Sequence, residues 1–180
     1  MSDHHRLARA ASCRSIVVGL MAALLLAPVT ARAEEKEPFA VLGFGAAGEW
    51  VLNGEGGASR GLTASIEFNP IKNWLEIEAG VTGLRRRGQT EWDTDLVFKK
   101  PFDLSPQVEF NPGLGPVWMH TISGGHATDA IGAEAVLEFM FWPTEDRKLG
   151  WFVEPSYTYS FARDHEQSFG FSTGLLIPIR

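Results

Sequence analysis

Three shortages narrow what this 180-residue chain can be. The sequence contains one cysteine, Cys13, which excludes a disulfide framework and a cysteine-rich metal site. Beyond residue 33 there is no run of 18 apolar residues, so no helix there can cross a bilayer. Basic residues are also few, since 16 Lys and Arg against 22 Asp and Glu give a net charge of −6. That balance excludes the basic surface that nucleic-acid binding requires.

The N-terminal residues have the three parts of a secretory signal peptide. A region with three arginines precedes a 14-residue apolar run over 16–29, and Ala31-Arg32-Ala33 follows as a small-residue cleavage site. We expect cleavage after Ala33, so that residues 1–33 are the signal peptide and residues 34–180 form one domain. The mature chain then has no cysteine and no thiol nucleophile. Its net charge becomes −9, because the signal peptide holds four of the basic residues and one of the acidic residues.

Apolar and polar residues alternate through most of the mature chain. Around residue 132, for example, Ile131, Ala133 and Ala135 share one face, whereas Gly132 and Glu134 occupy the other. A period of two predicts strands, and strands of ~9–11 residues are long enough to cross a bilayer when tilted. We expect eight strands, near 39–50, 58–68, 73–84, 90–100, 105–119, 127–142, 149–162 and 165–179.

Turn residues and tryptophans mark the ends of these strands. Proline and asparagine predict tight turns at 69–73, 100–103 and 142–146, and we place these on the periplasmic side together with both termini. The opposite set of connections lies at 53–57, 85–88, 123–126 and 163–164. All six tryptophans fall near strand ends, which is typical of the two aromatic girdles of a transmembrane barrel. We expect Trp50, Trp92 and Trp118 in the outer girdle and Trp74, Trp142 and Trp151 in the inner one.

In pattern and layout the mature chain resembles the small eight-stranded outer-membrane β-barrels of Gram-negative bacteria, such as the transmembrane domain of outer membrane protein A. The resemblance implies an all-β, antiparallel, up-and-down transmembrane barrel that functions as a monomer. Its partners would be outer-membrane lipid, lipopolysaccharide and the outer-membrane assembly machinery. Its role would be structural, in membrane integrity or adaptation, without a wide pore, because side chains fill a barrel of eight strands.

A soluble periplasmic barrel that binds a ligand is an alternative with the same periodicity. Alternation shows that one face of each strand is apolar, but it does not show whether that face meets lipid or a core. The girdle positions of the tryptophans and the polar face rich in Gly, Ser and Thr favour the membrane barrel.

The polar face of the strands carries far more acidic than basic residues. A turn near 71–72 would place Glu67 directly opposite Glu76, and like charges at that spacing destabilise a sheet. Enclosed carboxylates either share protons or hold a cation, whereas in a hydrated lumen or in bulk water their charges are screened. The acidic cluster that we expect in the periplasmic half comprises Glu67, Glu76, Glu78, Glu109, Glu138 and Glu154, with Lys99 as the main counter-charge.

Some outer-membrane barrels modify lipids with a His, Ser and Asp or Asn site, so a lipid-modifying acyl hydrolase is a second alternative. This chain lacks the compact His-x-Ser-Asn element of the lipid A deacylases. We therefore expect no enzyme activity, no cofactor and no metal site, although three imidazoles would suit zinc if two outer loops touched. The candidate residues are His120, Ser123, His126, Asp164 and His165, with Asp129 and Ser168 nearby.

Three consecutive arginines, Arg85, Arg86 and Arg87, end the third predicted strand on its outer side. Planar guanidinium groups bind phosphate through paired hydrogen bonds, and lipopolysaccharide phosphates lie at that level of the membrane. The triplet therefore predicts a lipopolysaccharide contact, with a solvated turn that stops at Gly88 as the alternative.

Overall fold

The computed structural model describes residues 38–53, 57–144 and 146–180 of the chain. The predicted signal peptide, residues 1–33, lies outside these ranges, as does Glu145 in the predicted turn at 142–146. No helix of the described part is long and apolar enough to span a membrane.

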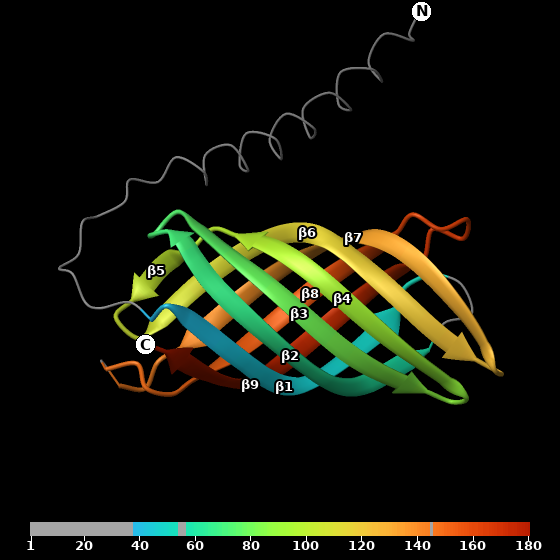
Figure 1. Ribbon diagram of the computed structural model, residues 1–180, viewed down its shortest axis with the longest axis horizontal. Coiled ribbons are helices and arrows are strands. Elements are labelled where there is room, and N and C mark those ends of the chain that lie inside the picture. The colour runs from blue at the N-terminus through green and yellow to red at the C-terminus, as the bar shows by residue number, and fades with distance from the viewer. Residues whose placement is uncertain (1–37, 54–56, 145) are drawn as a thin grey trace, which may run out of the picture. The chain divides into compact units, whose positions relative to one another are not determined.

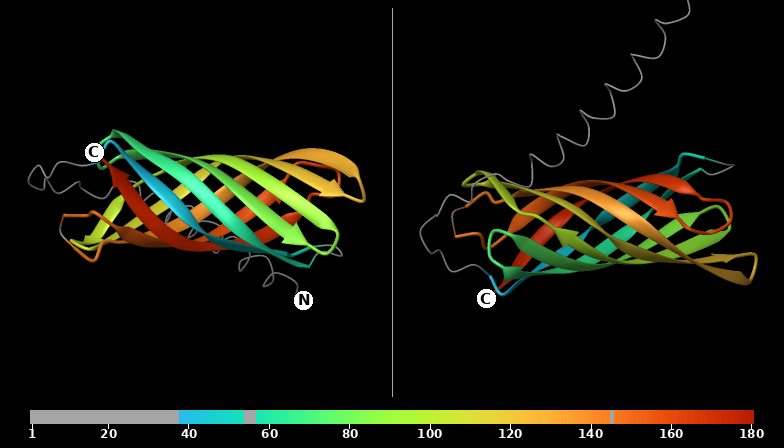
Figure 2. Two further views of the ribbon diagram at one scale, coloured as in Figure 1. Left: turned by 60° about the horizontal axis from the view of Figure 1, so that its bottom comes forward. Right: turned by 90° about the horizontal axis from the view of Figure 1, so that it is seen from above.

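The described residues form nine strands in one antiparallel sheet that closes into a barrel (Figure 1, Figure 2). Each long strand pairs with its sequence neighbour, β1 pairs with β9, and β4 pairs with β6. We call the end that carries Ala40 and Ile179 the terminal end and the opposite one the hairpin end. The strands are β1 (Ala40–Val51), β2 (Ala58–Ile71), β3 (Leu75–Arg86), β4 (Gln89–Lys99), β5 (Phe102–Ser105), β6 (Val108–Ser123), β7 (His126–Phe141), β8 (Gly150–Ser160) and β9 (Gln167–Ile179).

The short β5 continues β4 in the same register, so the barrel wall has eight strands, as predicted. The predicted turn at 100–103 is wrong, because the chain turns at 106–107 instead. Pro101 interrupts the strand without ending it. The Lys100 N–H donates to the Pro112 carbonyl of β6, so an N–H at position 101 would point away from β6. On the side away from β6, the pairing of β4 with β3 ends at Lys99. The N–H that proline lacks would therefore have had no strand partner, and no backbone hydrogen bond is lost.

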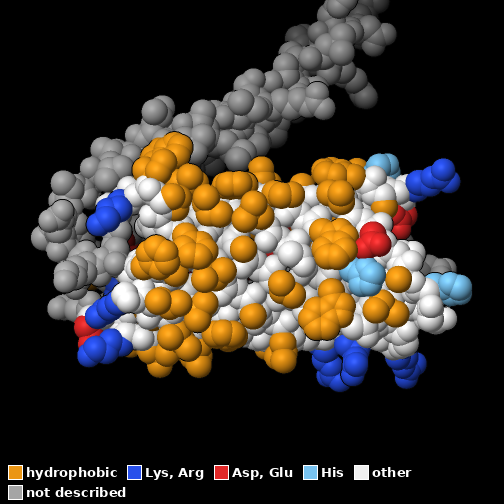
Figure 3. Space-filling model, in the orientation of Figure 1, with side chains coloured by type: hydrophobic (Ala, Val, Ile, Leu, Met, Phe, Trp, Pro, Cys, Tyr) orange, Lys and Arg blue, Asp and Glu red, His pale blue; other side chains and the backbone are white. Residues whose placement is uncertain are grey.

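The two faces of the barrel wall differ sharply in polarity. Large apolar side chains point outward and are exposed, among them Leu62 at 73 % and Leu114 at 61 %. Figure 3 shows them over the middle of the barrel, with charged side chains gathered at its two ends. The buried inward side chains include Lys99, Asn111 and Glu138. A water-soluble barrel needs the reverse arrangement, because an apolar surface of this extent is stable only against lipid or a partner.

Five of the six tryptophans are exposed on the outer surface near strand ends: Trp50, Trp74, Trp92, Trp118 and Trp151. The prediction for Trp142 is wrong, since this side chain is 2 % exposed and cannot reach lipid. Side chains along a strand point alternately to its two faces. Phe139 and Phe141 face outward, so Met140 and Trp142 point into the lumen. The inner girdle therefore has two tryptophans rather than three.

Candidate functional site

The lumen is filled by apolar side chains toward the terminal end. Met140, Trp142, Phe152 and Leu176 form one buried cluster, and Val41 packs against it. The indole N–H of Trp142 donates to Glu109 Oε2 at 3.2 Å, so the one polar atom of this ring is satisfied. These contacts leave little room for a water-filled channel through this end of the lumen.

Beyond this apolar cluster, the ammonium of Lys99 sits among four carboxylates from four different strands. Its Nζ lies 2.9 Å from Glu67 Oε1, 2.9 Å from Glu78 Oε2, 3.0 Å from Glu138 Oε2 and 3.2 Å from Glu154 Oε2. The Lys99 side chain has no exposed surface. An ammonium has three protons and one positive charge, so it can neither donate fully to four carboxylates nor balance their charge. We call these five residues the Lys99 cage.

Three buried oxygen atoms close to the Lys99 cage have no hydrogen-bond partner in the described structure: Glu67 Oε2, Glu76 Oε2 and Asn111 Oδ1. Glu76 lies directly opposite Lys99 in the pairing of β3 with β4. Asn111 is fully buried, and its Nδ2 donates to Glu138 Oε2 at 3.4 Å. Leaving a buried polar atom unpaired costs ~1–3 kcal/mol, so such atoms call for an explanation.

The predicted acidic cluster is largely brought together, with two differences. Glu67 lies opposite Glu78 rather than Glu76, because the chain turns at 72–74 rather than near 71–72 and the pairing of β2 with β3 is irregular between Phe68 and Ile71. Glu109 stands apart from the cage, since it forms an ion pair with Arg147 and accepts the Trp142 hydrogen bond. The sequence did not point to Asn111, although its inward position follows from the alternation along β6.

A second acidic group lies in the half of the lumen nearer the hairpin end. One oxygen each of Glu49, Glu91 and Asp93 lies within 4.8 Å of the others. Glu91, which sequence reasoning missed, accepts a hydrogen bond from Thr121 Oγ1 at 2.8 Å. At the rim, burial raises the pKa of Glu166, and the nearby carboxylates of Glu91 and Asp164 raise it further. A cavity of about 60 Å³ has six carboxylates in its lining: Glu49, Glu78, Asp93, Asp95, Glu134 and Glu154.

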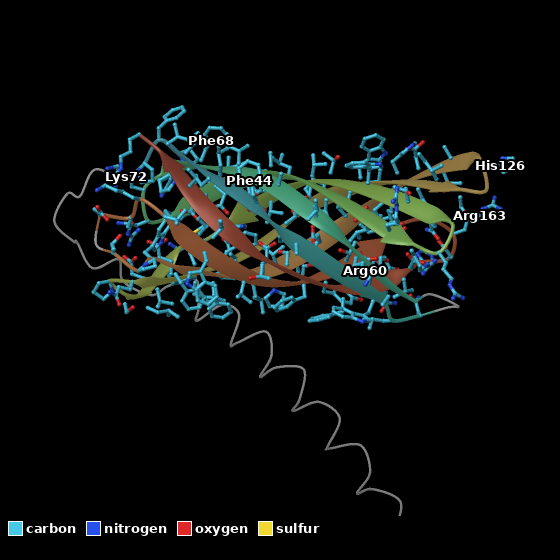
Figure 4. The ribbon with its side chains drawn as sticks, turned by 90° about the horizontal axis from the view of Figure 1, so that it is seen from below. Phe44, Arg60, Phe68, Lys72, His126 and Arg163 are labelled. Carbon is cyan, nitrogen blue, oxygen red and sulfur yellow. The ribbon has the colours of Figure 1, made fainter. Side chains whose placement is uncertain are left out.

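The three consecutive arginines do not act together. Arg86 points inward and donates to Gln89 Oε1 at 2.9 Å, whereas Arg85 and Arg87 are exposed. Arg60 of β2, which sequence reasoning did not single out, lies directly opposite Arg85 and is also exposed. Figure 4 shows Arg60 in the half of the barrel toward the hairpin end, far from Lys72 at the terminal end.

The histidine and serine candidates do not assemble into a catalytic site. His120 Nδ1 lies 2.8 Å from Asp129 Oδ1, and His165 Nδ1 lies 3.2 Å from the Tyr159 hydroxyl. His126 is at the tip of the β6–β7 hairpin, paired with Ser123 across the turn. Among the described residues no hydrogen bond joins a serine hydroxyl to either imidazole ring. This geometry gives the hydrolase hypothesis no support.

Comparisons of the sequence found no matching family model and no matching curated protein. Solved structures do match. Neisserial surface protein A (NspA) has 14 % sequence identity and a TM-score of 0.65, over 81 % of this chain and all of that one. Ail, the attachment invasion locus protein of Yersinia pestis, has 15 % identity and a TM-score of 0.55, over 78 % of this chain and 98 % of its own. Ail in complex with the heparin analogue sucrose octasulfate matches with a TM-score of 0.57.

The fold is that of the small eight-stranded outer-membrane β-barrels. Identities of 14 % and 15 % show the fold alone, so the roles of the similar proteins are not transferred with it. What distinguishes this chain must come from its own lumen and its own surface.

Proposed function

We propose that the protein is exported by its signal peptide, cleaved after Ala33 and inserted as a monomer into the outer membrane of a Gram-negative bacterium. The terminal end then lies in the periplasm and the hairpin end outside. The observation that carries this proposal is the inverted polarity of the wall, with apolar side chains exposed and charged ones buried. The outer-membrane assembly machinery would insert it, and its role would be structural, in membrane integrity or adaptation.

The filled lumen supports a structural role rather than a transport role. Apolar side chains occupy the lumen toward the terminal end, and the Lys99 cage crosses it from β2 to β8. An eight-stranded barrel of this kind is packed by side chains and has no wide pore.

On the outer surface, exposed arginines form a binding site for phosphate groups of lipopolysaccharide. Arg60 and Arg85 lie directly opposite each other, which is unfavourable for like charges unless an anion lies between them. The ring of Trp92 covers Gly83, which lies two residues before Arg85 on the same strand. The guanidinium groups therefore lie close to the outer aromatic girdle. Lipid phosphates lie at that depth, and paired guanidinium groups bind them well. We call Arg60, Arg85 and Arg87 the arginine patch.

The complex of Ail with sucrose octasulfate supports the same class of ligand. It shows a polyanionic sugar on a barrel of this fold. Lipopolysaccharide is also a sugar that carries several anionic groups, so the arginine patch would meet similar chemistry.

The triple variant Arg60→Gln, Arg85→Gln, Arg87→Gln tests this contact. We expect less lipopolysaccharide to co-purify with it from outer membranes, while its folding and membrane fractionation are unchanged. Arg86→Gln is the matched control, because this side chain comes from the same triplet but points inward. Equal lipopolysaccharide content in wild type and triple variant would refute the contact. Recovery of wild type in the soluble periplasmic fraction would refute the membrane location.

A further inference from the structure

The lumen near Lys99 carries more negative charge than its own basic side chain can balance. Four carboxylates bind the Lys99 ammonium, and Glu76 lies opposite it in the neighbouring strand. Lys99 supplies one positive charge for these five acids. The charge that remains is buried, where Coulomb repulsion is much stronger than in water.

Asn111 provides an independent indication of a missing ligand. Its amide carries no charge, so the shortage of positive charge does not explain why its Oδ1 has no donor. The side chain is fully buried, and its Nδ2 donates to Glu138 Oε2, so the amide group contacts the cage. A fully buried amide oxygen without a donor is the kind of ligand that a hard cation binds.

The atoms available around this position are all oxygens. Glu67 Oε2, Glu76 Oε2 and Asn111 Oδ1 have no partner, whereas Glu67 Oε1, Glu78 Oε2 and Glu138 Oε2 already bind the Lys99 ammonium. Carboxylate and amide oxygens are the ligands preferred by hard divalent cations such as Ca²⁺ and Mg²⁺. No cysteine or histidine is present in this set, so the donor chemistry does not favour softer metals.

The rest of the lumen offers an acidic path to the cage. Glu78 and Glu154 of the cage also line the cavity of about 60 Å³, together with Asp93, Asp95 and Glu134. This cavity extends toward the hairpin end, whereas apolar side chains fill the terminal end. A cation entering from the hairpin end would meet carboxylates along the way to the cage.

We propose that the lumen binds one divalent cation of the Ca²⁺ or Mg²⁺ class beside Lys99, with Glu76 and Asn111 among its ligands. Lys99 is then a tethered cation that holds the carboxylates together, and the metal ion balances the charge that the lysine leaves. The site is independent of the proposed lipopolysaccharide contact, because the arginine patch lies on the outer surface.

The experiment follows the thermal unfolding midpoint of the folded protein in lipopolysaccharide-free detergent micelles while CaCl₂ is added at constant pH and ionic strength. We expect calcium to raise the Tm of wild type, because a ligand that binds only the folded state stabilises it. We expect this increase to be lost in Glu76→Gln and in Asn111→Leu. Glu91→Gln is the control, because it removes a lumen carboxylate outside the cage, and its calcium response should match that of wild type.

Either of two results of the unfolding experiment would overturn the proposal. A wild-type Tm that calcium leaves unchanged would mean that bound protons alone neutralise the remaining carboxylates of the lumen. Loss of the calcium response in Glu91→Gln alone would place the cation in the second acidic group. If the Glu76→Gln and Asn111→Leu variants do not fold, terbium luminescence of wild type, excited through tryptophan, replaces them. We expect calcium to displace the terbium and Trp142→Phe to reduce the signal; a signal that calcium does not displace would overturn the site.

Discussion

At the scale of single residues, Lys99 organises the lumen. Its four carboxylate partners come from β2, β3, β7 and β8, so one side chain links strands on several sides of the barrel. Buried ion pairs are costly to form, yet removing one partner is more costly still, because it leaves the other charges buried and uncompensated.

Replacing Lys99 by methionine should therefore lower the free energy of unfolding by about 3–5 kcal/mol, because four buried carboxylates lose their ammonium. Urea unfolding in detergent micelles measures the change. Lys148→Met is the control, since Lys148 is 75 % exposed and forms its ion pair with Asp146 at the surface, so this substitution should change the stability far less. Equal losses in the two variants would show that Lys99 does not hold the cage together.

The alternation of the sequence identifies which acidic residues face the lumen, but it does not identify which of them contact one another. Alternation along β3 and β7 puts Glu76, Glu78 and Glu138 on the inner face. Which carboxylate meets which depends on the register, and the turn at 72–74, together with the irregularity after Phe68, places Glu78 rather than Glu76 opposite Glu67. The change of partner from Glu76 to Glu78 leaves no trace in the polar pattern, because both residues lie on the inner face of β3.

At the scale of elements, the alternation of apolar and polar residues predicts the eight strands correctly, but one of the turns between them is placed wrongly. Proline in a strand normally suggests a break, which led to the predicted turn at 100–103. Pro101 instead lies where the strand has a neighbour on one side only, so β5 continues the line of β4. Only the three-dimensional pairing reveals that edge.

The β6–β7 hairpin depends on two glycines at its tip. Gly124 and Gly125 have φ values of 57° and 82°, a left-handed conformation that costs other residues ~1–2 kcal/mol each. Gly124→Ala together with Gly125→Ala should therefore speed amide hydrogen exchange at 126–129 by about tenfold or more. Ser123→Ala is the control, because its φ is not positive. Unchanged exchange in the glycine variant would contradict this account of the turn.

At the scale of the whole molecule, the barrel has apolar side chains on its outside and charged ones inside, which is the reverse of a soluble barrel. Its exposed wall is apolar, and its lumen holds an apolar cluster, the Lys99 cage and an acidic cavity. Folds of this class accept very different sequences, as the identities of 14 % and 15 % with NspA and Ail illustrate. Overall polarity and alternation therefore predict the fold, whereas the ligand chemistry depends on individual residues such as Asn111 and Arg60.

The central claim is that the outer wall of the barrel contacts lipid while the lumen does not. Trp151 is exposed on the wall and Trp142 is buried in the lumen, although both lie near the terminal end. Variants that keep only one of them, with the other tryptophans replaced by phenylalanine, can be folded into vesicles whose lipids carry brominated acyl chains. The account predicts that bromine quenches the fluorescence of Trp151 strongly and that of Trp142 weakly. Trp151 fluorescence that is insensitive to bromine but quenched by a water-soluble quencher would contradict it.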